Sequence, residues 1–317
     1  MCSLVCGKSY LDKFIDSLQN SVMTIRNPST NLASAAVVIS SAIWGLYWIP
    51  LRYLKSLGVA EAWTVVMINI PAAVVIGVIF MFQFKAQRPH LRRGVMIGIF
   101  MGLTVAMFTI GLVYSSVVRV TLLFYLTPVW STMIGVYWLR EPVTRGRWLA
   151  IGIGLLGLLF LMSQGDRQVP LNIGDLYGFV SGITWAIGGA MIKRYGEVPM
   201  PTLLFFQFLL ASVFAWLLGA AAGLAPTPSL MFLLQVAPES VAISIGLILP
   251  SILIMFWAQK FLFPGRVGLL MITEVLVATL TASLFLPNEA MGLIEWIGAT
   301  LIVGACFVEI LVHPVET

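Results

Sequence analysis

Residues 94–139 read GVMIGIFMGLTVAMFTIGLVYSSVVRVTLLFYLTPVWSTMIGVYWL and contain a single charged residue, Arg119. A helix needs about 20 apolar residues to cross a bilayer, so the two runs beside Arg119 predict two successive membrane-spanning helices. The rest of the chain has the same character, with 60% hydrophobic and 10% charged residues. So few charges cannot cover a water-soluble globule. We therefore expect an all-α, polytopic membrane protein.

Runs with few or no charges predict ten membrane-spanning helices. They are 27–51, 62–84, 94–118, 120–139, 148–165, 176–192, one within 198–238, 240–259, 267–288 and 290–312. The run 198–238 is too long for one crossing, and we expect Gly223, Pro226, Pro228 and Pro238 to divide it into a helix and a loop. The expected organisation is an N-terminal tail, 1–31, five helices in 32–165, five more in 166–312, and a C-terminal tail, 313–317.

Lysine and arginine indicate the orientation. With the N-terminus in the cytoplasm, the outer segments hold Arg52, Lys55, Arg119 and Arg167, and the other Lys and Arg of the 18 fall on the cytoplasmic side. Positive charge in short loops marks that side, so we expect both termini in the cytoplasm and a multi-pass protein of the cell inner membrane. The tail lacks the pattern of a signal peptide. The charge lies along one membrane face, so no nucleic-acid partner is expected.

Three cysteines and two distant histidines exclude a disulfide framework and a histidine-based metal or triad site. We accordingly expect no catalytic residues, no metal and no cofactor.

An internal repeat relates the two sets of five helices. Residues 41–45, SAIWG, match residues 182–186, GITWA, and the tryptophan of each is followed eight positions later by a cation, Arg52 or Lys193. Trp44 and Trp185 are thus 141 residues apart. Self-similarity at a fixed offset is the signature of a duplicated unit.

A second anchor lies at the other end of each half. Glu141 precedes Trp148 by seven residues, and Glu289 precedes Trp296 by seven, at an offset of 148. Because five is an odd number of crossings, the second half enters the membrane from the opposite side. Glu141 is then expected on the cytoplasmic face and Glu289 on the outer face. Inverted repeats support alternating access, so the duplication favours a secondary transporter.

These residues resemble the drug/metabolite transporter superfamily, specifically its ten-helix EamA-type members, which include exporters of amino acids. The resemblance rests on Ala42-Ile43-Trp44-Gly45, on the run from Leu126-Thr127-Pro128-Val129 to Leu139-Arg140-Glu141, and on the Glu–Trp spacings, and it covers about residues 32–312. It implies a central cavity lined by helices 1, 3, 4, 6, 8 and 9, with helices 5 and 10 at the periphery. The motifs specify the superfamily well and the substrate poorly.

The chain departs from the family pattern at two places. Helix 2 has Asn69-Ile70-Pro71 where many members have an arginine, and the second-half position that matches Thr127-Pro128 reads Thr273-Glu274. Both departures bear on which substrate and coupling ion are used.

Glu274 is expected to be the one carboxylate well inside a span. An ionised carboxylate there costs about 2.5–3.5 kcal/mol on insertion scales, and burial favours the neutral form of a carboxyl group. Glu274 is therefore a candidate proton carrier or partner for a substrate ammonium group. The alternative is a protonated carboxyl group that hydrogen-bonds a neighbouring helix.

Aromatic side chains supply the other candidate binding residues. Trp44, Tyr47 and Trp48 are spaced to share one helix face, where they would form a wall for a flat or amphipathic substrate. The remaining candidates are Tyr114, Tyr125, Trp130, Trp185, Gln207 and Trp257. The alternative is an interfacial belt, to which Trp63, Trp138 and Trp148 are assigned.

Prolines and uncharged polar residues within the spans are weaker candidates for a functional role. Pro128 and Pro250 are candidate gating hinges, with static kinks as the alternative. Asn69 and Gln259 are expected to serve helix association.

The leading hypothesis is export of small amphipathic metabolites such as amino acids, with possible proton coupling through Glu274, by a monomer or homodimer. A carrier of nucleotide sugars or sugar phosphates is disfavoured, because phosphate would need Lys or Arg inside the spans. A membrane-embedded enzyme would need a nucleophile with a base, or clustered metal ligands.

Overall fold

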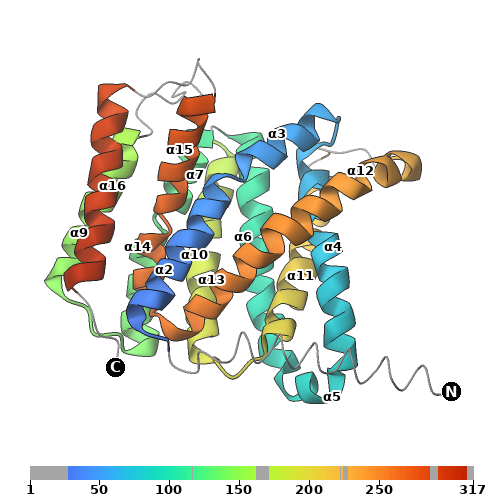
Figure 1. Ribbon diagram of the computed structural model, residues 1–317, viewed down its shortest axis with the longest axis horizontal. Helices are drawn as coiled ribbons and strands as arrows, with labels where there is room; N and C mark the ends of the chain where they lie inside the picture. Colours follow the sequence, from blue (N-terminus) through green and yellow to red (C-terminus); the bar gives the residue numbers. More distant parts are fainter. Residues whose placement is uncertain are drawn as a thin grey trace.

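The computed structural model describes residues 28–115, 117–161, 171–221, 223, 228–285 and 292–312, and the regular elements within them are helical (Figure 1). Residues 1–27 of the expected tail, the C-terminal tail 313–317 and Glu289 lie outside the described residues.

Ten helical segments cross the molecule, and several consist of more than one piece. They are α2 (Thr30–Gly45) with α3 (Trp48–Ser56); α4 (Glu61–Phe82); α6 (Leu91–Tyr114); α7 (Val117–Phe124) with α8 (Thr127–Ile134) and the π-helix η2 (Gly135–Leu139); α9 (Arg145–Leu161); α10 (Ile173–Arg194); α11 (Met200–Ala221); α12 (Leu230–Ile243) with the π-helix η3 (Ser244–Ile248) and α13 (Leu249–Phe261); α14 (Pro264–Leu270) with α15 (Thr273–Phe285); and α16 (Leu293–Val312). The short α5 (Phe84–Gln87) and the 3-10 turn η1 (Arg88–His90) join α4 to α6.

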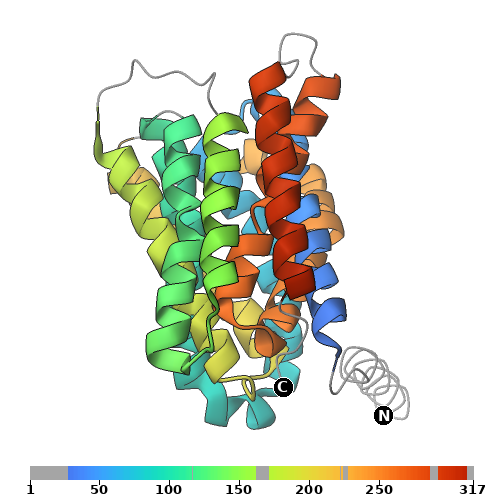
Figure 2. The ribbon, with the colours of Figure 1, turned by 90° about the vertical axis from the view of Figure 1, so that its left-hand side faces the viewer.

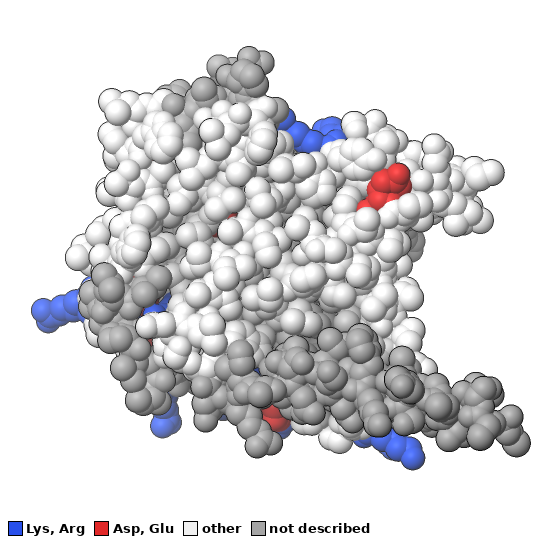
Figure 3. Space-filling view, in the orientation of Figure 1, with Lys and Arg blue, Asp and Glu red and all other residues white. Residues whose placement is uncertain are grey.

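Seven of these helical stretches within the described residues are long and apolar enough to cross a membrane. The expected all-α architecture of ten segments is confirmed. Figure 3 shows the corresponding surface: the middle of the visible face is almost uncharged, and Lys and Arg atoms appear at its upper, left and lower margins.

The eighth segment corrects one expectation. We expected Pro238 to lie in a loop, but it lies inside α12, which begins at Leu230 after Ser229 caps it by accepting a hydrogen bond from the Phe232 N–H. A proline costs a span one backbone hydrogen bond, which such helices tolerate. Glu239 therefore also lies within an apolar segment, so Glu274 is not the one carboxylate inside a span.

The two halves run in opposite directions. In Figure 1, α2 rises from the lower edge, whereas α10 descends from the upper edge. At the upper end the Ser115 hydroxyl donates to the Asp175 carboxylate over 2.5 Å, and at the lower end Arg194 donates to the Trp138 carbonyl over 3.3 Å. The expected inverted repeat of five and five segments is thus confirmed.

Close contacts at glycines hold the segments together. α9 and α16 stand side by side at one edge (Figures 1 and 2), and a Cβ at Gly298 would lie 2.6 Å from the Gly157 carbonyl oxygen. These are the fifth and tenth segments, which the resemblance placed at the periphery. At Gly152 of α9, in contrast, an added Cβ would meet no atom within 4 Å.

Candidate functional site

The fourth and ninth segments are interrupted at corresponding positions. α7 stops at Phe124 and α8 resumes at Thr127, while α14 stops at Leu270 and α15 resumes at Thr273. Discontinuous helices at matching places in two inverted halves are the typical location of transporter binding sites. We call each of these two interruptions a break, and the level of the molecule at which both lie the level of the break.

Each break is stabilised in the same way. The Thr127 hydroxyl donates to the Phe124 carbonyl over 2.5 Å, because Pro128 has no N–H to serve that oxygen. In the second half, the Glu274 N–H bonds the Met271 carbonyl at 3.0 Å, and the Thr273 hydroxyl donates to the Leu270 carbonyl. In both halves a threonine thus replaces a missing helical hydrogen bond.

The first helix of each half packs against the break of the other half. A Cβ at Gly45 of α2 would lie 2.6 Å from the Glu274 carbonyl oxygen, and one at Gly182 of α10 would lie 2.7 Å from the Phe124 carbonyl oxygen. Both glycines are therefore required for the close approach of backbone to backbone.

Glu274 lies at the break with its side chain half-buried. The buried Tyr125 hydroxyl faces the Glu274 carboxyl group closely enough to interact with it, without a well-aligned hydrogen bond. About two turns above Glu274, roughly 10 Å along α15, the Thr281 hydroxyl accepts a 3.0 Å hydrogen bond from Trp48 Nε1. A carboxyl group of the second half and a phenol of the first half therefore meet at this level, and an indole of the first half contacts α15 about two turns higher.

The aromatic group of the first segment is arranged differently from the prediction. Trp44 lies one residue before the end of α2, and Trp48 begins α3. The chain between the two helices turns, because the Tyr47 N–H donates to the Trp44 carbonyl three residues back. The prediction that these three side chains share one continuous helix face is therefore wrong. Trp44 and Tyr47 instead pack edge to face with ring centroids 5.0 Å apart, while Trp48 points to α15 and lies under Arg52 at 5.2 Å.

The other predicted site residues do not gather around Glu274. Tyr114 packs on Gly174 at the upper end of α6. The Trp130 ring lies 5.5 Å from the Phe179 ring and lines a surface groove with exposed Tyr137. Trp257 packs at a tilt against Phe261 at the lower end of α13, and Gln207 is buried in α11. Trp185 is buried in α10 below the break. Pro128 and Pro250 lie in the first turns of α8 and α13, directly after a break and a π-helix.

The described helices pack more tightly below the level of the break than above it. All residues of α14 are buried, and a Cβ at Gly268 would lie 3.0 Å from the Pro128 Cα of α8. Above the break, α15 packs mainly on α2 and α7 mainly on α10, and residues 277–283 of α15 are half-buried.

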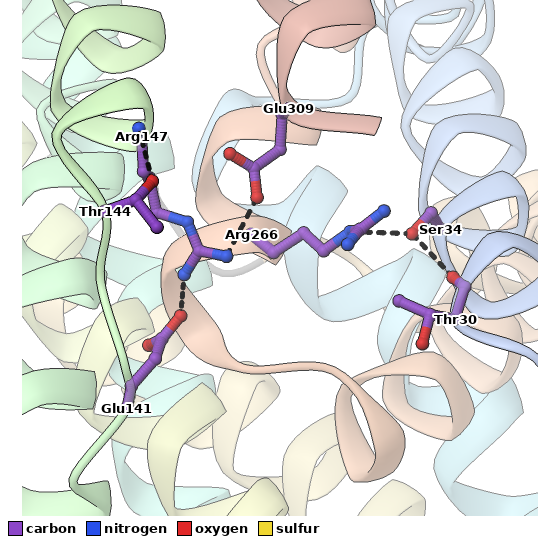
Figure 4. Close-up of polar contacts among 7 residues, drawn as sticks. All are labelled: Thr30, Ser34, Glu141, Thr144, Arg147, Arg266 and Glu309. Atoms are coloured by element: carbon purple, nitrogen blue, oxygen red, sulfur yellow. Dashed lines mark hydrogen bonds and ion pairs between the residues drawn. The ribbon is translucent and has the colours of Figure 1, made fainter. Parts of the chain in front are cut away.

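A buried charge cluster at the lower end was missed by the sequence analysis. Arg147 of α9 donates to Glu141 and pairs with Glu309 of α16 at 3.0 Å, while Arg266 Nε of α14 donates to Ser34 at 2.9 Å (Figure 4). Both arginines were assigned to cytoplasmic loops. The sequence did contain one indication of this cluster, because the carboxylates Glu141 and Glu309 lie at segment ends on the same face as the arginines.

Comparisons with known proteins agree with this architecture. The family model described as EamA-like transporter family matches the chain twice, at residues 31–163 and 172–311. A solved structure titled "Crystal structure of protein" has the same fold, with a TM-score of 0.68, 17% identity, and coverage of 89% of this chain and 96% of that one.

Three relatives share part of the chain. Uncharacterized transporter YyaM of Bacillus subtilis is 26% identical over 39% of this chain and 44% of its own length. An uncharacterized transporter of Archaeoglobus fulgidus is 25% identical over 67% of this chain and 74% of its own. The S-adenosylmethionine uptake transporter of Rickettsia bellii is 26% identical over 46% of this chain and 48% of its own.

The match to the first and third of these relatives thus spans less than half of their own length. The family model, in contrast, covers both halves of the chain, one on either side of residues 164–171. The duplicated, inverted and broken segments are those of a multi-pass membrane transporter rather than an enzyme, and the chain belongs to the EamA-like transporter family.

Proposed function

We propose that this protein exports small amphipathic metabolites that carry a positive group, such as amino acids, across the inner membrane by alternating access. The observation that carries this proposal is the position of Glu274, half-buried at a break beside Tyr125, with Trp48 bound to the same helix about two turns higher. A carboxylate within a span needs a cation or a proton as its partner. Aromatic rings nearby can cover the apolar part of a substrate.

The difference between the two ends supports the transport cycle. Packing of α8 on α14 closes the lower side, whereas the α15 residues above the break are half-buried. Two inverted halves can exchange these roles, because each contains the same kind of broken segment. We propose that the lower face, where most Lys and Arg lie, is cytoplasmic.

Phosphorylated substrates fit this site less well. They need cations that face the passage, but Arg147 is engaged by Glu141 and Glu309, and Arg266 by Ser34. A second candidate function is uptake of S-adenosylmethionine, which the names of the relatives in Rickettsia bellii and Rickettsia felis favour. Its sulfonium and ammonium groups belong to the same chemical class that Glu274 would bind.

Transport into proteoliposomes tests the proposal. Purified protein should exchange at least one compound from a panel of labelled amino acids and S-adenosylmethionine, measured with and without a pH gradient of either sign. Glu274→Gln should lower that rate at least tenfold, because the carboxylate is lost. Glu239→Gln is the matched control, since it removes a carboxylate from α12, and it should transport normally. Selective exchange of sugar phosphates, or a Glu274→Gln protein with unchanged transport, would reject the proposal.

A further inference from the structure

A small cavity lies below the break, between the lower pieces of the two broken segments. It is lined by Ser131 of α8, Trp185 and Gly189 of α10, Gln259 of α13 and Val267 of α14. The cavity has room for about one water molecule. Elements from both halves therefore meet around it, on the side of the molecule that is closed.

Gln259 is the unusual member of this lining. Its side chain is 1% exposed, and neither its amide oxygen nor its amide nitrogen has a hydrogen-bond partner among the described residues. An unpaired buried polar group destabilises a fold, so a position used only for packing would favour an apolar residue. Asn69, in contrast, donates to the Val65 carbonyl at 2.8 Å. Helix association, which we expected for both residues, explains Asn69 but not Gln259.

The chemistry of the lining indicates what it can bind. A glutamine amide places a hydrogen-bond donor beside an acceptor, and this pair matches the edge of a nucleobase such as adenine. The Trp185 indole supplies a flat apolar surface, and Gly189 leaves the amide accessible, since even a Cβ there would lie 3.8 Å from Gln259 Oε1. The residues named above carry no charge, which favours a neutral group.

We propose that Gln259 and Trp185 form a second substrate subsite that binds a neutral, planar group with adjacent donor and acceptor, as on a nucleobase, when α8 and α14 separate. This inference rests on the proposed function, because the subsite opens only if the lower side opens. Along α10, Gly182 lies at the break and Gly189 seven residues further down, a rise of about 10 Å. The substrate therefore has its positive group at Glu274 and its planar group about two turns lower.

Two sulfonium amino acids test the subsite, because they differ in the nucleobase. Proteoliposomes with wild-type protein should transport S-adenosylmethionine with a KM about tenfold lower than that of S-methylmethionine. Gln259→Leu should remove this preference and leave the thermal unfolding temperature unchanged or higher, because it deletes an unpaired polar group.

Gln87→Leu is the matched control, since Gln87 is equally buried but accepts a hydrogen bond from Thr202. It should lower the unfolding temperature and keep the preference. A wild-type protein without the preference, a preference that survives in Gln259→Leu, or a marked loss of stability in Gln259→Leu would each overturn the subsite. If no compound of the panel is transported at all, the proposed function itself has failed; if transport persists with the preference unchanged in Gln259→Leu, only the subsite has.

Discussion

The breaks of the fourth and ninth segments have the same geometry and different chemistry. Thr127 and Thr273 each donate to the carbonyl three residues back, and a glycine of the opposite half contacts each break. The next residue is Pro128 in the first half and Glu274 in the second. The duplication thus supplies two similar interruptions, and the difference at one of them supplies the carboxyl group that we propose binds the substrate.

The ends of the two halves differ in a similar way. Arg147 precedes Trp148 in the first half, and Glu295 precedes Trp296 in the second. Arg147 pairs with two carboxylates, whereas the buried Glu295 Oε1 has no hydrogen-bond partner among the described residues. Buried ion pairs around Arg147 therefore hold the described helices together at the lower end.

The largest effect on stability is expected when Arg147, the cation that distinguishes the lower end, is replaced. Arg147→Gln leaves Glu141 and Glu309 buried without their cation, which should destabilise the protein by about 3–5 kcal/mol. Unfolding in detergent, followed by circular dichroism, measures the loss. Arg145→Gln is the control, because Arg145 is exposed and should change stability by less than about 0.5 kcal/mol. Equal stability of the two variants would show that the cluster does not hold the lower end.

A smaller effect is expected where the two halves are alike. Gly45→Ala and Gly182→Ala each push a Cβ against a backbone oxygen, so each should destabilise the protein by about 1–3 kcal/mol. Gly152→Ala meets no atom within 4 Å and should be neutral or stabilising. The same unfolding measurement compares the three. A large loss for only one of the two contact glycines would mean that the breaks are not packed equivalently.

The smallest effect is expected at the threonines. Thr127→Val and Thr273→Val remove one hydrogen bond each, so each should cost about 0.5–1.5 kcal/mol. The two costs should agree within about 0.5 kcal/mol, and the double variant should show their sum, since the sites share no hydrogen bond. Clearly unequal losses would argue against a common role for the two hydroxyl groups.

Much of the fold could be predicted from the sequence, because bilayer thickness sets the length of an apolar run. The ten segments, the repeat and its inversion all follow from charge spacing and matched motifs. Thr273-Glu274 was also recognisable as a departure from Thr127-Pro128. The sequence did not reveal that both positions interrupt a helix. A Thr-Glu pair is compatible with a continuous helix, and only the hydrogen bond to the Met271 carbonyl shows the break.

The site was predicted less completely, because single positions do not reveal burial or pairing. Arg147 and Arg266 sit at segment ends, as loop cations do, yet both are buried by neighbouring segments. Trp130 is as aromatic as Trp48, but only the helix rotation shows that it faces Phe179 and a surface groove. Gln259 resembles any polar residue of a span until its lack of hydrogen bonds is seen.

The central claim is that Glu274 holds the positive group of the substrate at the second break. The most direct measurement is transport of L-phenylalanine against N-acetyl-L-phenylalanine, which lacks the ammonium charge, by wild-type protein, Glu274→Gln and Glu239→Gln in proteoliposomes. A hydrogen bond to a charged group contributes about 1.5–3 kcal/mol, so wild type and Glu239→Gln should favour the amine at least tenfold in kcat/KM. Glu274→Gln should show no preference. A preference that persists in Glu274→Gln would contradict the account.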